Sequence, residues 1–324
     1  MARNPDLPRP AKLTIAKADL LSLLRSVDSN KVSIDRILRL ETAFRGRIDN
    51  HVSALPGHTS KFSEFNTSPF VLMFYCKQKQ YNYVHQIEQD ILPAKIFSSM
   101  ETSAGRMVQS IVLPMYEWES VETTTMHSSG SVIDGRRMEK DYLKLATIKS
   151  GPRCLNDEMS KDIATDIVEH SEQWAKEAGV DHIEFTYGVL YGTQVQSNKK
   201  DRHILRNVVE AVGSRFVIEH PRDSWGCSFK IRNIRIDVSI RIGAELFSYL
   251  GGNLALIELL CSLIRACVVP ANPLRKEPNY SISDLRDIIS TVSVPKEFNV
   301  GILQRSQLEW LFFLARHYCD MIVD

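Results

Sequence analysis

The sequence predicts an α/β fold in which helices flank a central mixed β-sheet, with helical additions at both ends of the chain. Three observations support this fold class. Residues 234–242 alternate apolar and polar side chains over nine positions, which is the pattern of a half-buried strand. Residues 182–192 form a second run of strand type, rich in β-branched and aromatic side chains. Upstream of it, apolar residues recur at helical spacing from Ile163 to Trp174, so strand and helix patterns alternate along the chain.

Length and composition predict three segments. With 324 residues, 44% of them hydrophobic, the chain can bury a substantial core. We expect a helical N-terminal elaboration over residues 1–65, a core over residues 66–269 and a helical C-terminal segment over residues 270–324. Apolar residues at helical spacing in residues 16–40 and 302–323 favour helices in the two outer segments.

Local signals define the elements expected before the centre of the chain. Ser33 is a candidate N-cap for a helix that starts at Ile34. Residues 70–75 are apolar and aromatic, which fits a short strand or the start of a buried helix. Two helices should follow, the first ending at Pro93 and the second at Pro114, because proline cannot continue the hydrogen-bond ladder of a helix.

The central stretch of the chain carries residues suited to catalysis. Residues 131–134 are expected to form a strand that ends in Asp134, residues 135–141 a charged turn, and residues 143–149 a second strand that ends in Lys149. A carboxylate is a hard oxygen ligand of the kind that Mg2+ prefers, and an adjacent ammonium group can orient a water molecule and neutralise a phosphate. This pair points to phosphodiester hydrolysis. The alternative is a solvated hairpin whose charges have no function.

A Gly-Pro corner and a helix follow Lys149. Asn156 or Asp157 can accept the free amide groups at the start of this helix, which should extend to Gly179. Arg153 lies between the lysine and the helix, and its guanidinium can make two parallel hydrogen bonds to guanine or clamp a phosphate. The alternative for Arg153 is an ion pair with a neighbouring carboxylate.

Basic and apolar segments alternate in the remaining sequence. Residues 193–206 are expected to form a loop that contacts phosphates, or one that is only solvated; its cationic residues are Lys199, Lys200, Arg202, His203 and Arg206. Trp225 is expected to pack in the core rather than to contact DNA. A short strand is expected at residues 216–219, and helices are expected at residues 243–250, 254–269 and 283–292.

Several short motifs resemble a known family. The sequence Ile-Lys-Ser-Gly-Pro-Arg-Cys-Leu-Asn-Asp at residues 148–157, together with Tyr-Gly-Val-Leu-Tyr-Gly at residues 187–192, resembles type II restriction endonucleases of the PD-(D/E)XK superfamily, in particular a branch that reads interrupted GG–CC palindromes. Further motifs follow the order of this family, at residues 66–70, 99–105, 112–114, 198–206 and 243–252. The resemblance rests on this order more than on any single motif.

The resemblance implies a PD-(D/E)XK nuclease core over residues 66–269 and a homodimer that hydrolyses double-stranded DNA at a short palindrome with Mg2+. It implies that Asp134, Lys149 and Glu101 are catalytic and that Asp134 and Glu101 hold the metal. It also implies a set of DNA contacts, at Arg153, Asn156, Lys199, Lys200 and Arg202.

This chain departs from the family at one position. The superfamily usually has Glu or Asp two positions before the lysine, whereas this chain has Thr147, a weak and neutral metal ligand. The second acidic ligand must therefore come from elsewhere. Glu101, on the helix that resembles the first active-site helix of the family, is the leading candidate, and an ordinary exposed carboxylate is its alternative. Further candidates are Glu139, Asp141 and Glu158.

Composition limits the partners and the location. The formal net charge is +1, so DNA binding requires the basic residues to cluster on one face. The six cysteines include no CxxC pair, which argues against zinc. The first residues lack the apolar core of a signal peptide, and the apolar run at residues 254–269 is too short and too charged to span a bilayer. We expect a bacterial cytoplasmic location, no membrane partner and no nucleotide cofactor.

Three alternatives to a restriction endonuclease remain open. The first is a nuclease of the same fold that works in repair or recombination. The second is a DNA-binding protein whose metal site has decayed, and Thr147 is the residue that favours it. The third is an unrelated regulatory α/β protein.

Overall fold

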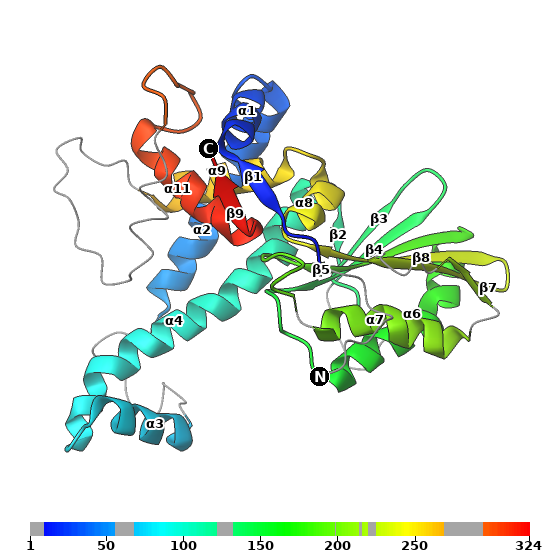
Figure 1. Cartoon of the computed structure of the whole chain (residues 1–324), viewed down its shortest axis with the longest axis horizontal. Helices are drawn as coiled ribbons and strands as arrows, with labels where there is room; N and C mark the ends of the chain where they lie inside the picture. Colours follow the sequence, from blue (N-terminus) through cyan, green and yellow to red (C-terminus); the bar gives the residue numbers. More distant parts are fainter. Residues whose placement is uncertain are drawn as a thin grey trace.

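The computed structural model describes residues 10–55, 68–121, 132–197, 199–213, 216–219, 225–268 and 294–324. Its centre is a seven-stranded sheet with the strand order β2-β3-β4-β5-β8-β7-β6 (Figure 1). The strands are β2 (Glu119–Ser120), β3 (Gly135–Met138), β4 (Leu143–Lys149), β5 (His182–Val189), β6 (Val217–Glu219), β7 (Gly226–Ile231) and β8 (Ile234–Ile242). The alternating strand and helix patterns thus predict the α/β class correctly.

The sheet has a parallel centre and antiparallel edges. β5 runs parallel to β4 on one side and to β8 on the other. Beyond β4, strands β3 and β2 continue the sheet in antiparallel pairs, and β7 and β6 do so beyond β8. Because β4 and β5 are parallel, the chain between them must cross a face of the sheet, and the helix that follows β4 makes this crossing.

Helices cover both faces of the sheet, but unequally (Figure 1). α6 (Asp157–Ala178) and α7 (Lys199–Val212) lie below the sheet in this view and share a core with it that includes Ile167, Trp174 and Phe185. The upper face carries α8 (Ala244–Gly251) at one end. Around β7 and the turn between β3 and β4, no helix of the described ranges lies on the upper face.

A second core lies in the helical part of the molecule beside α8. α9 (Ala255–Cys267) is at its centre and contacts α8 and three further helices, which are α1 (Lys17–Asp28), α2 (Lys31–Ser53) and α11 (Arg305–Ala315). Next to this core, β1 (Thr14–Ala16) pairs in parallel with β9 (Met321–Val323). The N-terminal and C-terminal segments are therefore joined to each other and to the central segment.

The expected crossover helix is confirmed together with the signals that bound it. Asn156 is the N-cap of α6, since its Oδ1 accepts the backbone N–H of Met159 at 2.8 Å. Gly179 closes the helix in the left-handed conformation, at φ 70°. β8 spans the nine residues of the alternating pattern, and Arg235 and Arg241 lie on its polar face.

The expected turn at residues 135–141 is largely wrong, because most of it is strand β3. The turn itself is shorter, and the backbone N–H of Glu139 donates to the carbonyl of Tyr142 at 2.9 Å. Arg136 and Arg137 suggested a solvated turn. In the sheet, these two side chains form ion pairs with Glu119 and Glu139, so charged residues are accommodated in a strand near the sheet edge.

Two helix boundaries also differ from the expectation. Asn30, and not Ser33, caps α2: its Oδ1 accepts the backbone N–H groups of Val32 and Ser33 at 3.0 and 3.3 Å. Pro93 does not end a helix but lies inside α4 (Glu88–Met107). A proline removes one hydrogen bond from the ladder; its ring is exposed here and the helix continues past it.

Three further segments differ from the expected secondary structure. Residues 70–75 belong to an exposed helix, α3 (Pro69–Lys79), and not to a strand or a buried helix. The expected basic loop contains the start of α7. The last expected helix stops at Ala315, and a 3-10 turn, η5 (Arg316–Tyr318), and β9 follow. The helix expected at residues 283–292 lies outside the described residues.

The length and apolar content of the described helices bear on whether they could cross a membrane. Taken singly, none has the length and apolar content needed to cross a membrane. α8 and α9 have the necessary length and apolar content only as a pair, and this pair is bent by 102° at the break between the two helices. In the fold, α9 is largely buried in the second core.

Candidate active site

Asp134 and Lys149 lie at the same edge of the sheet. β3 and β4 are antiparallel with Gly135 opposite Ala146, so the start of β3 is next to the end of β4. Asp134 directly precedes β3, and its backbone N–H donates to the carbonyl of Ala146 at 2.8 Å. A strand ending at Asp134 and followed by a turn would have placed it near Leu143 instead. The pair is thus brought together by a strand that the sequence pattern did not predict.

The carboxylate of Asp134 is held by two donors. Its Oδ2 accepts the backbone N–H of Ile148 at 2.6 Å, and its Oδ1 accepts the side-chain amide of Gln109 at 2.6 Å. Burial raises the pKa of Asp134, although the Ile148 N–H and the charge of Lys149 act in the opposite direction. An ionised carboxylate has about four acceptor directions, so these two bonds leave capacity for a cation or a water molecule.

Gln109 is a site residue that the sequence analysis missed. It lies in η3 (Val108–Val112), a π-helical segment between α4 and α5 (Leu113–Met115). The Gln109 carbonyl accepts the hydroxyl of Ser120 at 2.6 Å. π-Helical turns inside α-helices occur often at functional sites. The sequence signal that could have found Gln109 is its position eight residues after Glu101, because helical residues at this spacing lie on roughly the same side of the helix.

Glu101 lies on α4, and this helix passes the end of β4. Gly105 approaches Ser150 so closely that a Cβ atom on the glycine would lie 3.6 Å from the Ser150 Cβ. Glu101 precedes Gly105 by about one helical turn, about 6 Å along the axis, and its side chain is exposed. Gln109, in the segment that follows α4, is the residue of this stretch that contacts Asp134.

Thr147 occupies the position where the family usually has an acid. Its side chain is buried, with 2% of the residue exposed. Its hydroxyl donates to the carbonyl of Val132. Thr147 therefore joins the end of β4 to the segment before Asp134, and no solvent reaches it in this arrangement.

The loop between β4 and α6 presents Arg153 to solvent. Arg153 is exposed and adopts a left-handed backbone conformation at φ 72°. Gly151, two residues earlier, lies under the ring of Tyr191, where an added Cβ would meet the ring at 2.5 Å. Glycine is needed for this close approach. The ion-pair alternative for Arg153 is not observed with Asp157, whose carboxylate instead contacts Lys200 and His203.

Three further expected DNA contacts, Lys199, Lys200 and Arg202, lie on α7. Lys200 forms an ion pair with Asp157, which joins α7 to the start of α6. The guanidinium of Arg202 lies over the ring of Trp225, 5.0 Å from the ring centroid. The side chain of Lys199 lies outside the described residues, although its backbone belongs to α7. Two of these cations thus have partners within the protein.

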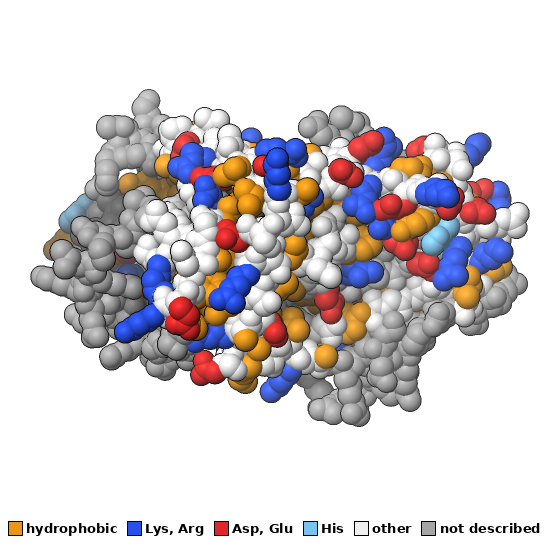
Figure 2. Space-filling model, turned by 90° about the horizontal axis from the view of Figure 1, so that it is seen from above, with side chains coloured by type: hydrophobic (Ala, Val, Ile, Leu, Met, Phe, Trp, Pro, Cys, Tyr) orange, Lys and Arg blue, Asp and Glu red, His pale blue; other side chains and the backbone are white. Residues whose placement is uncertain are grey.

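A second polar cluster, which the sequence analysis did not identify, lies on the upper face of the sheet. The carboxylate of Asp237 accepts hydrogen bonds from Ser228 at 2.5 Å and from Arg235 at 3.1 Å, and contacts Nε2 of His182 at 2.8 Å. Burial raises the pKa of Asp237, but these bonds outweigh burial and the pKa is lowered. Figure 2 shows both signs of charge mixed over this part of the molecule.

Metal-binding potential rests on few ligands. Among the described residues, no group of three or more His, Cys, Asp or Glu side chains is arranged to hold a metal ion. Asp134 lies just before β3 and Glu101 lies on α4, and Glu101 is not among the groups that act on the Asp134 carboxylate. Mg2+ is commonly bound through one or two carboxylates, with waters and substrate phosphates completing its shell. The donor set therefore fits Mg2+ better than a metal that needs a full protein cage.

Comparison with known protein families finds no family model that matches this chain, and comparison with curated proteins finds no match either.

Proposed function

We propose that this chain is a Mg2+-dependent, sequence-specific endonuclease for double-stranded DNA, of the type II restriction kind and with a PD-(D/E)XK core. The observation that carries the proposal is the meeting of Asp134 and Lys149 at one sheet edge, with α4 beside them. A buried carboxylate next to an ammonium group suits the binding of a hard cation and the positioning of a water molecule.

In this proposal Asp134 and Glu101 hold the metal, which when bound supplies a Lewis acid for the scissile phosphate. Asp134 is kept in one orientation by Gln109 and by the Ile148 N–H. Lys149 positions the attacking water and neutralises charge on the phosphate. Thr147 takes no part in binding the metal, because it is buried and bonded to Val132.

The DNA is proposed to contact the loop that follows β4. Arg153 is the residue best placed to read a base or clamp a phosphate, because it is exposed and four residues from Lys149. Asn156 uses its oxygen to cap α6, which leaves its NH2 group for DNA. The start of α6 also supports anion binding, since free N–H groups gather at the N-terminus of a helix. Lys199, Lys200 and Arg202 remain further proposed contacts.

The proposal includes a homodimer, because a palindromic site is matched by twofold symmetry of the protein. Cleavage of both strands then requires two copies of the site.

Cleavage of a long duplex DNA tests the proposal. The protein is incubated with the DNA in Mg2+, beside EDTA and the Asp134→Ala variant. The expected result is a set of discrete bands that needs Mg2+ and is lost in the variant. Cleavage at scattered positions favours a repair or recombination nuclease instead. No cleavage in Mg2+ or Mn2+ overturns the nuclease assignment.

One observation favours a second candidate, a DNA-binding protein that does not cut. The position that usually supplies an acidic ligand is filled by a buried threonine. Such a protein would bind duplex DNA at low salt with equal affinity in Mg2+ and in EDTA. A gel-shift measurement in both solutions, next to the cleavage assay, separates the two candidates.

A further inference from the structure

The segment that leads into the candidate site exposes an unusual amount of apolar surface. We define the arm as residues 68–100, which comprise α3, the 3-10 turn η2 (Val84–Ile87) and the first part of α4. In Figure 1 the arm projects away from the sheet and from the helices around α9.

α3 is apolar around its whole circumference. Its first residues are Pro-Phe-Val-Leu-Met-Phe-Tyr-Cys, with cations only in the last turn. A soluble helix that is apolar all round is normally buried. Here Phe70 is 76% exposed and Phe74 is 73% exposed. The sequence of α3 is thus suited to a buried helix, whereas a single chain leaves it open.

The arm also lacks a core of its own. No described side chain between Ser68 and Met100 is fully buried. Its exposed large apolar side chains extend over all three of its elements, and they are Phe70, Val71, Met73, Phe74, Tyr83, Val84, Phe97 and Met100. An apolar surface of this kind on a soluble protein marks an interaction site.

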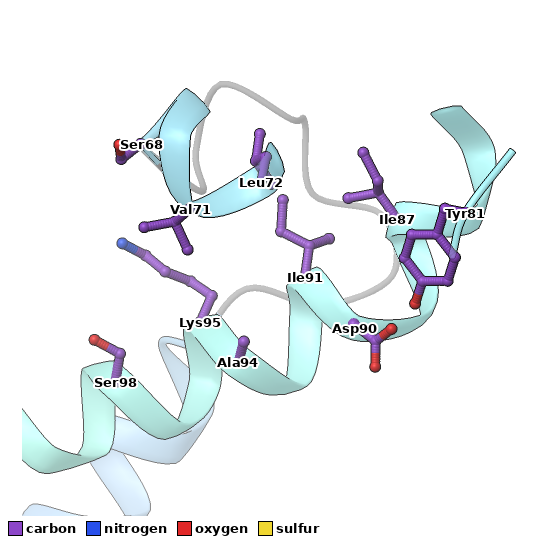
Figure 3. A pocket seen from close by; sticks show the side chains of 10 residues that line it. All are labelled: Ser68, Val71, Leu72, Tyr81, Ile87, Asp90, Ile91, Ala94, Lys95 and Ser98. Atoms are coloured by element: carbon purple, nitrogen blue, oxygen red, sulfur yellow. The ribbon is translucent and has the colours of Figure 1, made fainter. Parts of the chain in front are cut away.

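A cavity of about 260 Å³ opens between α3 and α4 (Figure 3). Apolar side chains from both helices point into it, among them Val71, Leu72 and Ile91. Polar groups lie at its sides, with Lys95 near one end and Asp90 near the other. The arm therefore has both exposed aromatic side chains and an apolar cavity.

We infer that the arm is a self-association surface, and that its occupant is the arm of a second copy of this chain. A twofold interface requires a surface that is complementary to itself. Phe70 and Phe74 supply the protruding part and the cavity between α3 and α4 the receiving part, so one arm holds both halves of the contact.

The exposed area is sufficient for a stable dimer. An aromatic side chain buries about 150–250 Å², and the arm exposes four of them, between 65% and 76% each: Phe70, Phe74, Tyr83 and Phe97. These alone supply roughly 400–700 Å². Together with the exposed valine and methionine side chains, the apolar area of the arm approaches the area that each partner contributes to a standard interface, which is about 800 Å².

The charges of the arm argue against DNA or a membrane as the occupant. Lys79 forms an ion pair with Asp90 at 3.5 Å, so one of its cations is already neutralised. α3 lacks the cationic face along its length that an interfacial helix uses to bind anionic lipid. A protein surface of matching apolar character suits the arm better than either.

The inference rests on the homodimer of the proposed function and names its surface, and mass in solution tests it. Multi-angle light scattering on the full chain is expected to give twice the mass of one chain, falling toward that of one chain on dilution. The double variant Phe70→Glu/Phe74→Glu is expected to have the mass of one chain throughout. The control is Val32→Glu, which places one such charge on an apolar site of α2 that is 63% exposed.

A measurement on the unaltered protein covers the case in which the variant folds poorly. Amide hydrogen exchange of residues 69–79 is expected to slow as the protein concentration rises, while exchange in α2 stays constant. A single-chain mass at every concentration overturns the inference. So does a dimer that survives in the double variant, or an exchange rate in α3 that ignores concentration. DNA cleavage is no readout here, so failure of the nuclease proposal leaves this test unaffected.

Discussion

The side-chain amide of Gln109 donates to Oδ1 of Asp134 at 2.6 Å. This bond joins the π-helical segment after α4 to the sheet edge where Lys149 ends β4. The segment that follows the helix with Glu101 therefore contacts Asp134 directly, just before β3 begins.

Replacing Asp134 by Asn should abolish cleavage without loss of stability at neutral pH. Burial raises the pKa of Asp134, so its ionised form costs stability above that pKa, and the cost disappears as the pH falls toward the ordinary value of 3.8. The Asn oxygen can still accept the Ile148 N–H, and the Gln109 amide can turn to accept the Asn NH2. Thermal unfolding at several pH values measures this.

Asp134→Ala is the contrasting variant. It removes both acceptors and leaves the Ile148 N–H without its partner, at a cost of about 1–3 kcal/mol. Denaturant titration should show this loss. Equal stability of the Ala and Asn variants would contradict the described hydrogen bonds.

Lys149→Gln should remove cleavage and retain DNA binding, since the ammonium group acts on the water and the scissile phosphate. Lys144→Gln is the matched control on the same strand, because Lys144 lies on the opposite face and pairs with Glu139 at 3.1 Å. Cleavage rate and gel-shift affinity are measured for both. Retained cleavage in Lys149→Gln would remove the lysine from the mechanism.

Glu101→Gln should raise the Mg2+ concentration needed for half-maximal cleavage by about tenfold or more, because a lost carboxylate weakens the metal site. Glu117→Gln serves as the control, being an exposed carboxylate outside the site. Titration of the cleavage rate with Mg2+ compares them. An unchanged Mg2+ requirement would mean that Glu101 is an ordinary surface residue.

Asp237→Asn should destabilise the protein at neutral pH, on the order of 1 kcal/mol after allowance for solvent exposure. The pKa of Asp237 is lowered by Ser228, His182 and Arg235, so its stabilising contribution is present above the ordinary pKa of 3.8 and is lost as pH falls through the lowered value. Denaturant unfolding at neutral and at strongly acidic pH measures the difference. A difference that persists at acid pH would contradict this cause.

Arg153→Ala should mainly affect DNA binding, and Lys200→Ala should mainly affect stability. Arg153 is exposed and free to reach DNA, so its removal should weaken binding and change the sequence preference. Lys200 pairs with Asp157 and joins α7 to α6, so its removal should mainly reduce stability. Gel shifts and thermal unfolding on both variants separate the two roles. Unchanged DNA affinity in Lys200→Ala would remove Lys200 from the proposed DNA contacts.

Elements with strong periodicity or clear end signals could be predicted from the sequence. β8 follows its alternating pattern, and α6 is bounded by Asn156 and Gly179 as expected. β3 could not be predicted, because Arg136 pairs with Glu119, a carboxylate 17 positions away that becomes its neighbour only in the sheet. The prediction that a helix ends at Pro93 was wrong, because α4 continues past the proline despite the lost hydrogen bond.

The site was predictable in residue type more than in geometry. The sequence predicted Asp134 and Lys149 at the ends of two paired strands. The structure places Lys149 at the end of β4, but Asp134 lies just before β3 and residues 132–134 form no strand. The sequence did not indicate Gln109, because a glutamine in a helix has no distinctive pattern by itself. Its contact with Asp134 depends on how α4 crosses the sheet edge, which is a tertiary property.

The pairing of β1 with β9 has a consequence for the order of folding. Leu13 bonds to Asp320, and 307 positions separate the two residues. During synthesis, β1 leaves the ribosome long before β9 exists, so this small sheet can form only after the intervening chain has emerged. Contacts of such large sequence separation form slowly. The pairing should therefore be among the last native contacts to appear, and it fastens a fold whose two cores are already built.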